Sequence, residues 1–221
     1  MTRMFVLVAA LSLMAAGSRV QANVVTFNGV SSSGNPTLTL FTPLTTEGFT
    51  FTSPHFHTVD SPGTTGYGGA VDNGTIYIAE EAGSLGLPIT MAAQSGQPFG
   101  LVSFDGAELW LDAAAAAAGG YPNASYINVL GNLSGGGTVN AQFTLDGIAD
   151  GAGGAADFQT FALPGSFVNL ASVVFSGAQV TGAPGAIALD NLNTGAIPAP
   201  GALLLGSIGA ALVARFRRRA A

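Results

Sequence analysis

The chain has 221 residues, a formal net charge of −6 and no cysteine. All six basic residues lie before residue 20 or after residue 214, and all twelve acidic residues lie between, so this middle part carries a charge of 0 − 12 = −12. Phosphate backbones and anionic lipids are held by Lys and Arg, so nucleic acid is excluded as a partner of this part. Without Lys or Arg salt bridges, and without disulfides, the domain must be held by apolar burial and backbone hydrogen bonds.

The N-terminal residues have the three parts of a secretory signal peptide. Arg3 is basic, residues 4–16 are apolar, and Val20-Gln21-Ala22 fits a small-residue cleavage site. An apolar run of about 13 residues is too short for a transmembrane helix, which needs about 20. We therefore expect residues 1–22 to be removed on export and one domain to occupy residues 23–196.

The domain is rich in Gly, Thr, Ser and Asn, and short β-branched or aromatic runs alternate with turn residues. This spacing is typical of an all-β sandwich or barrel. Alternation in Phe49-Thr50-Phe51-Thr52 indicates antiparallel sheets with one wet face. Residues 113–118 are expected to form one or two helical turns, with Asp112 as N-cap, or an ordered low-complexity loop. The expected strands are residues 24–27, 37–41, 49–52, 75–78, 89–92, 101–104, 107–111, 125–129, 138–145, 157–163, 171–175 and 187–192.

A Gly-rich acidic segment lies between two of these strands. Asp146, Asp150 and Asp157 supply carboxylate oxygens, which are the ligands that Ca²⁺ prefers, and no basic residue competes for them. Their spacing matches neither an EF-hand nor a Gly-Gly-x-Gly-x-Asp repeat. A Ca²⁺ site at these residues is one hypothesis, and a solvated hairpin loop is the other.

Trp110, Tyr121 and Tyr126 are candidates for glycan contact. A flat ring stacks on the face of a sugar while polar neighbours bond its hydroxyl groups. Trp110 alternates with Leu109 and Leu111, so it faces the opposite side of its strand. Burial of Trp110 in the core is the competing interpretation.

No catalytic motif accompanies the acids of the chain. Glycoside hydrolysis needs two carboxyl groups about 5 to 9 Å apart, a distance that the sequence does not supply. There is no nucleophile elbow and no Cys/His pair, so we expect a protein that is not an enzyme. His55 and His57 are expected in an exposed loop rather than at a metal site. The acids considered for such a pair are Glu47, Glu80, Glu81, Asp105, Glu108 and Asp112.

The C-terminal segment, residues 197–219, has three parts in order. Pro198-Ala199-Pro200 precedes an uncharged apolar run of about 16 residues, which as a helix would measure roughly 24 Å against a bilayer core of about 30 Å. A cluster of arginines follows, and because arginines stay on the cytoplasmic side, we expect the chain before Pro198 to lie outside. This cluster consists of Arg215, Arg217, Arg218 and Arg219.

This arrangement resembles the PEP-CTERM sorting signal of Gram-negative bacteria, which an exosortase recognises and cleaves near its Pro-x-Pro motif. Pro198 and Pro200 match the two prolines, whereas Ala199 stands where the family usually has Glu. The resemblance implies one C-terminal transmembrane helix as a transient anchor, followed by delivery to the cell surface or the exopolysaccharide matrix. An ordinary C-terminal membrane anchor is the alternative.

The last expected strand contains Leu189-Asp190-Asn191, an ending similar to that of many PEP-CTERM proteins and of sandwiches like carbohydrate-binding modules. This resemblance implies an antiparallel β-sandwich of jelly-roll type. The leading hypothesis is an exported, non-catalytic surface or matrix protein, with polysaccharide as a candidate ligand. The alternatives are a secreted glycan hydrolase and a Ca²⁺-stabilised adhesive module.

Overall fold

The computed structural model describes residues 23–30, 39–40, 43–54, 56–59, 70–71, 73–80, 87–110, 114, 116–117, 122–146 and 158–195. All of them belong to one unit of the chain, Asn23–Gly195. The signal peptide and the sorting segment predicted for residues 1–22 and 197–219 lie outside the described residues, as does most of the helical turn predicted after Asp112. Within the described ranges, no helix is long and apolar enough to cross a membrane.

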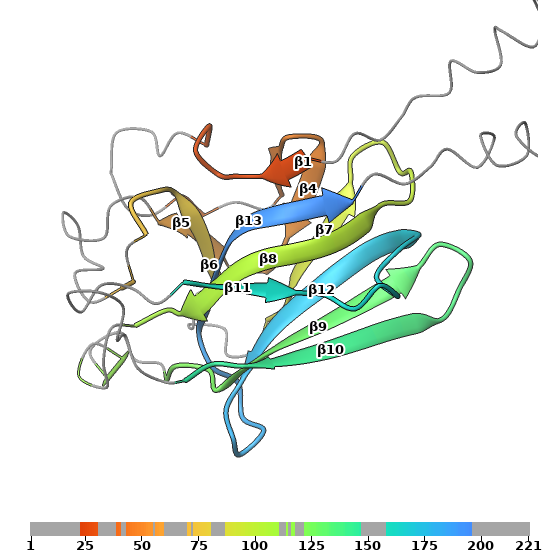
Figure 1. Ribbon diagram of the computed structural model, residues 1–221. Coiled ribbons are helices and arrows are strands. Elements are labelled where there is room, and N and C mark those ends of the chain that lie inside the picture. The colour runs from red at the N-terminus through yellow and green to blue at the C-terminus, as the bar shows by residue number, and fades with distance from the viewer. Residues whose placement is uncertain are drawn as a thin grey trace, which may run out of the picture. The chain divides into compact units, whose positions relative to one another are not determined.

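The strands form two antiparallel sheets, as Figure 1 shows. The strands of sheet A are β1 (Asn23–Val25), β2 (Thr39–Leu40), β5 (Phe56–Val59), β6 (Tyr77–Glu80), β8 (Gly100–Glu108), β11 (Gln159–Ala162) and β13 (Ile187–Gly195). The strands of sheet B are β3 (Leu44–Thr46), β4 (Phe49–Thr52), β7 (Ile89–Ala93), β9 (Tyr126–Leu133), β10 (Thr138–Thr144) and β12 (Leu170–Ala178). Sheet A has the order β11-β8-β13-β6-β5-β2, with β1 also on β13, and sheet B has the order β10-β9-β12-β7-β4-β3.

The prediction of an all-β, antiparallel domain is confirmed for the described residues. β4 has its predicted bounds, and burial alternates along it as the sequence pattern requires. The sequence predicts two strands at residues 101–104 and 107–111, but the structure has one, β8. Gly106 interrupts the side-chain pattern there because a Cβ atom at this position would lie 2.6 Å from Cδ1 of Ile127 in sheet B.

Two strands, β3 and β5, are missing from the prediction. β5 was predicted as an exposed histidine pair, and this is wrong for His57, which is 5% exposed. His57 pairs with Ala79 of β6, and both side chains are buried. Polar residues in a short segment concealed a strand that lies inside its sheet between β2 and β6.

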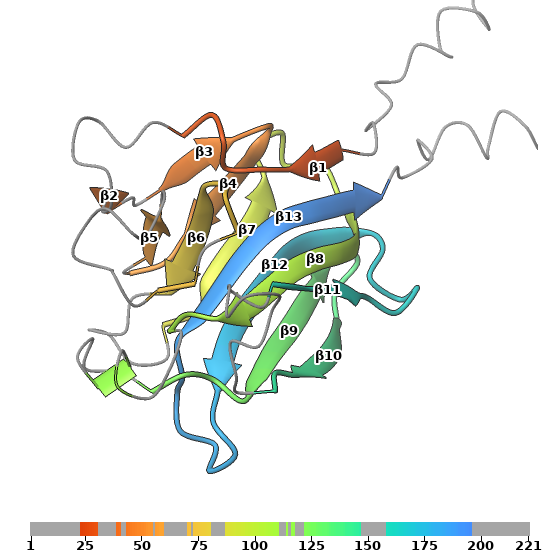
Figure 2. The same ribbon diagram turned by 60° about the vertical axis from the view of Figure 1, so that its left-hand side comes forward.

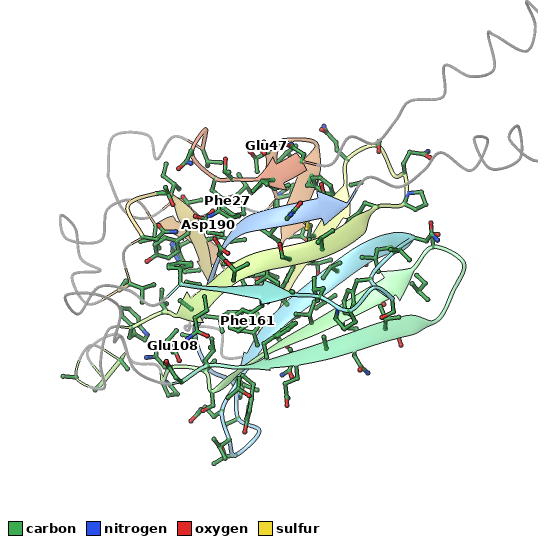
Figure 3. All side chains as sticks on the ribbon, viewed as in Figure 1. Phe27, Glu47, Glu108, Phe161 and Asp190 are labelled. Carbon is green, nitrogen blue, oxygen red and sulfur yellow. The ribbon has the colours of Figure 1, made fainter. Side chains whose placement is uncertain are left out.

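Aromatic side chains from both sheets pack between them. The ring of Phe104 in sheet A lies 5.5 Å from that of Phe143 and 5.3 Å from that of Phe175, both in sheet B. Phe161 extends the cluster, with its ring centroid 5.0 Å from that of Phe143 (Figure 3). T-shaped pairs such as those of Phe104 stabilise by roughly 0.5–1.5 kcal/mol beyond the burial of area. The facing sides of the two sheets therefore share one apolar core.

The first and last strands of this unit pair with each other. Asn23 lies opposite Thr194 in the β1–β13 ladder, and Figure 2 shows β1 beside the C-terminal half of β13. The hydroxyl of Thr194, which is fully buried, donates to the Asn23 carbonyl oxygen at 2.9 Å and accepts from the Asn23 N–H at 3.3 Å. The Thr194 side chain thus connects the first strand of the unit to its last strand through two hydrogen bonds.

Candidate functional site

Several residues singled out by the sequence lie outside the described residues. They are Pro198, Ala199, Pro200, Arg215, Arg217, Arg218, Arg219, Tyr121, Asp150 and Asp157. Asp146 is described and exposed, and it accepts a hydrogen bond from Nε2 of Gln159 at 3.4 Å. Within the described ranges, no three His, Asp or Glu side chains come together in a way that could hold a metal ion.

Trp110 lies inside the domain. Its side chain is 7% exposed and belongs to an apolar cluster with Tyr77, Ala107 and Ala188. Asn123 holds its backbone, since Nδ2 of Asn123 donates to the Trp110 carbonyl at 2.7 Å and its Oδ1 accepts the Trp110 N–H at 2.9 Å. A sugar would have no access to the ring face, so Trp110 is not part of the candidate site.

The outer face of sheet B is the candidate site. It comprises the side chains that point away from sheet A, and none of the six strands contains an Asp, Glu, Lys, Arg or His residue. Tyr126 is the one glycan-contact candidate found on it, at the start of β9, where it is half-buried. The described acids of the strands, such as Asp105, Glu108 and Asp190, are all on sheet A.

The strand register arranges this outer face in rows across β12, β9 and β10. The middle row consists of Val174, Leu130 and Asn140, so it is apolar on β12 and β9, where Leu130 is 39% exposed, and polar on β10. On one side of this row lie Ser176, Asn128 and Gln142, and on the other lie Ser172, Asn132 and Thr138. Tyr126, between Ala178 and Thr144, forms the next row beyond Asn128.

Hydrogen bonds across the strands orient the amide groups of the outer face. Nδ2 of Asn132 donates to Oγ of Ser172 at 2.9 Å, and Nε2 of Gln142 donates to Oδ1 of Asn128 at 2.8 Å. Each amide retains donor or acceptor capacity after these bonds. The face thus offers an apolar pair of side chains, Val174 and Leu130, surrounded by neutral donors and acceptors, which suits a ligand with C–H surfaces and hydroxyl groups.

The sequence carries a signal for this face in the alternation of residues along β9 and β10. In β9, Tyr126, Asn128, Leu130 and Asn132 are exposed or half-buried, whereas the residues between them are buried. This period of two continues in β10, where Thr138 to Thr144 alternate exposed and half-buried. No charged residue occurs from residue 113 to residue 145.

A different polar cluster lies on sheet A, around two carboxylates on neighbouring strands, one of which, Asp190, is labelled in Figure 3. Asp190 of β13 pairs with Asp105 of β8, and Asn191 joins the two. The Asn191 N–H donates to Oδ1 of Asp190 and its Nδ2 to Oδ2 of Asp105, both at 2.8 Å. Asn191 adopts a φ of 46°, where the register of β13 shifts. The two bonds hold this residue in a backbone conformation that non-glycine residues rarely adopt.

Neutral side chains also donate hydrogen bonds to both carboxylates. Nδ2 of Asn73 and the Thr75 hydroxyl each donate to Oδ2 of Asp190 at 2.8 Å. The Thr160 hydroxyl donates to Asp105 at 2.6 Å. Burial raises the pKa of Asp190, the hydrogen bonds from Thr75, Asn191 and Asn73 lower it, and the charge of Asp105 raises it again, with a net increase.

This carboxylate pair has the wrong surroundings for glycoside hydrolysis. Asp190 is 1% exposed, so a leaving group could not approach its proton. Among the acids considered from the sequence, Glu108 is 3% exposed, and Glu47 accepts a hydrogen bond from the Thr26 hydroxyl at 2.9 Å. Glu81, Asp112 and the side chain of Glu80 lie outside the described residues. The hydrogen bonds from Asn191 to Asp190 and Asp105 connect the two carboxylates at the register shift of β13.

No protein-family model matches the chain, and no curated protein matches it. Among solved structures, it is similar to a DUF4465 family protein from Bacteroides caccae ATCC 43185, with 14% sequence identity and a TM-score of 0.45. The match covers 80% of this chain and 100% of that chain. A similarity at this level carries no argument about function, which therefore depends on the geometry described above.

Proposed function

We propose that this chain is an exported, non-catalytic cell-surface or matrix protein, and that the outer face of sheet B binds a neutral polysaccharide. One observation carries the binding proposal: this face presents an apolar pair, Val174 and Leu130, between two rows of neutral amides and hydroxyls and contains no charged residue. Sugar rings pair C–H faces with apolar side chains, and their hydroxyl groups exchange hydrogen bonds with amides. Tyr126 adds a ring at one end of this arrangement.

Charge supports a neutral ligand over an acidic one. Residues 23–195 contain all twelve acidic residues and no Lys or Arg. A polysaccharide bearing uronate or sulfate groups would be repelled by this charge and would find no guanidinium or ammonium group to bind. Neutral glycans avoid this repulsion.

The fold of the domain and the processing of the chain are also part of what we propose. We propose a β-sandwich of jelly-roll type, exported by the signal peptide and held by the C-terminal helix until an exosortase cleaves near Pro198-Ala199-Pro200. The unit Asn23–Gly195 ends before Pro198, and it begins directly after the expected signal-peptide site at Ala22. Cleavage at both places would leave its strands whole, which supports the proposed processing.

Thermal unfolding of the full-length chain in mild detergent tests the binding proposal. A ligand that binds only the folded state, at 100 times its dissociation constant, adds roughly 2.7 kcal/mol to the free energy of unfolding. We expect neutral polysaccharides to raise the melting temperature and acidic ones to leave it unchanged. A rise with acidic polysaccharides alone would contradict the proposal, and a loss of stability with a chelator would favour the Ca²⁺-stabilised module instead.

Cellular processing tests the sorting proposal separately. In a Gram-negative host that contains an exosortase, the mass of the mature chain should show loss of both terminal segments. Without the exosortase, or with Pro198→Ala and Pro200→Ala together, the C-terminal segment should remain attached and the chain should stay in the membrane fraction. Unchanged processing in both cases would favour an ordinary membrane anchor.

A further inference from the structure

β10, one of the two edge strands of sheet B, is longer than the other edge strands of the two sheets. β10 ends the sheet on one side, and in the described part of the chain it pairs on its other side with β9 alone (Figure 1). It has seven residues, whereas the other edge strands, β1, β2, β3 and β11, have three, two, three and four. Short edges limit unwanted pairing between chains, and β10 lacks this protection.

β10 itself also lacks charge, proline and a bulge, which are other devices that keep an edge from pairing. Its sequence, Thr138-Val139-Asn140-Ala141-Gln142-Phe143-Thr144, contains no charged residue and no proline. Its register with β9 is unbroken over all seven residues, so no bulge twists it away from a partner. An unprotected edge of this length is a template for a further strand.

Two backbone hydrogen bonds at its ends fix which backbone groups of β10 face outward. The Leu133 N–H donates to the Gly137 carbonyl at 3.0 Å, and the Leu145 N–H donates to the Ser125 carbonyl at 2.9 Å. Because hydrogen-bonded and non-hydrogen-bonded pairs alternate in an antiparallel ladder, Val139, Ala141 and Phe143 direct their backbone groups to β9. The even-numbered residues, Thr138, Asn140, Gln142 and Thr144, therefore direct theirs to the free edge.

The sequence of β10 is complementary to itself when read in reverse. If two copies pair antiparallel about Ala141, Thr138 lies opposite Thr144, Asn140 opposite Gln142, and Val139 opposite Phe143. This register places the outward backbone groups of both copies in the hydrogen-bonded pairs, and it keeps hydroxyls with hydroxyls, amides with amides and apolar side chains with apolar side chains.

We propose that β10 is an interface between two copies of this chain, which pair antiparallel through their β10 strands with Ala141 on the two-fold axis. This axis stands perpendicular to the sheet, so the outer faces of both copies lie on the same side and form one continuous polar face. The opposite edge of sheet B, β3, has three residues. Assembly thus closes at two copies rather than continuing as a filament.

A single introduced cysteine tests the register, because the chain contains no cysteine of its own. In the full-length chain carrying Ala141→Cys, the two sulfurs meet at the axis, and mild oxidation should convert most of the chain to a covalent dimer on a non-reducing gel. Thr45→Cys, exposed on β3 at the other end of the sheet, is the matched control and should remain monomeric. Equal yields of dimer from both variants, or none from Ala141→Cys, would overturn the proposal.

Two charged variants in the Ala141→Cys background test whether a loss of dimer comes from the interface or from misfolding. Asn140→Lys with Gln142→Lys puts two lysines opposite each other in both pairs and should lower the yield of dimer about tenfold. Asn140→Lys with Gln142→Glu makes both pairs complementary and should preserve the yield within about twofold. Similar yields from the two combinations would show that these residues do not lie opposite each other, and would refute the two-copy interface.

Discussion

Gly177 shows how closely the backbones approach at the end of sheet B. A Cβ atom there would collide with the carbonyl oxygen of Gly185 and lie 2.7 Å from Cγ2 of Ile187. We expect Gly177→Ala to lower the free energy of unfolding by about 1–3 kcal/mol, since backbone must move to relieve the overlap. Gly165→Ala, where no atom lies within 4 Å of the added carbon, should change it by less than about 0.5 kcal/mol. Chemical denaturation measures both, and equal effects would contradict this account of the close approach.

Asp190 makes stability depend on pH in a direction opposite to that of a salt-bridged carboxylate. Its pKa is raised on folding, chiefly by burial, so the folded state holds the proton more tightly than the unfolded state. The resulting stabilisation is fully present below the ordinary carboxyl pKa of about 4 and is lost as pH rises through the raised value. Between pH values of about 4 and 7, the free energy of unfolding should therefore fall more steeply in the wild type than in Asp190→Asn. Parallel slopes would contradict the assignment.

At the level of strands, the β1–β13 ladder depends on the Thr194 hydroxyl. Thr194→Val keeps the shape of the side chain but removes both hydrogen bonds to Asn23. Because the site is fully buried, we expect a loss of about 1–2 kcal/mol in the free energy of unfolding. Thr52→Val, at an exposed position of β4, should stay within about 0.5 kcal/mol of the wild type. If both variants melt alike, the two hydrogen bonds do not stabilise this ladder.

Strand prediction succeeded for β4 and β10, where apolar and polar side chains alternate, and failed for β5, where that contrast is absent. β4 and β10 alternate clearly and were located to within one residue. β5 was missed because His57 and Thr58 are both polar and both buried, so no apolar face marks the strand. β8 was divided because Gly106 has no side chain to show which way it points. Most strands could therefore be predicted from the local sequence. The errors at β5 and β8 arise because their residues are buried by residues that lie far away in the sequence.

The candidate site could be predicted only in part from the sequence, because its residues come from strands that lie far apart in the chain. Tyr126 was identified, but its neighbours on the outer face of sheet B come from β10 and β12, and only the strand register brings them together. Trp110 was chosen by residue type, and the apolar cluster that covers it is assembled from separate segments. Asp105 and Asp190 lie 85 positions apart in the chain (190 − 105), so their pairing was not predictable.

At the scale of the whole molecule, charge acts against the folded state. Residues 23–195 carry twelve acidic residues and no Lys or Arg, so folding brings like charges together without compensation. Salt screens this repulsion, and raising NaCl from about 0.05 M to about 0.5 M should raise the melting temperature. Differential scanning calorimetry at constant pH makes this measurement. A lower melting temperature at high salt would mean that net repulsion does not limit stability.

The outer face of sheet B is the proposed binding site for a neutral polysaccharide. The most direct test is the dissociation constant of the full-length chain for an immobilised neutral polysaccharide, compared between Asn128→Ala with Asn132→Ala and a control, Asn193→Ala on sheet A. We expect the double variant to bind at least about tenfold more weakly, which corresponds to about 1.4 kcal/mol, and the control to bind as the wild type does. Unchanged binding by the double variant, or equal weakening by the control, would contradict the proposed site.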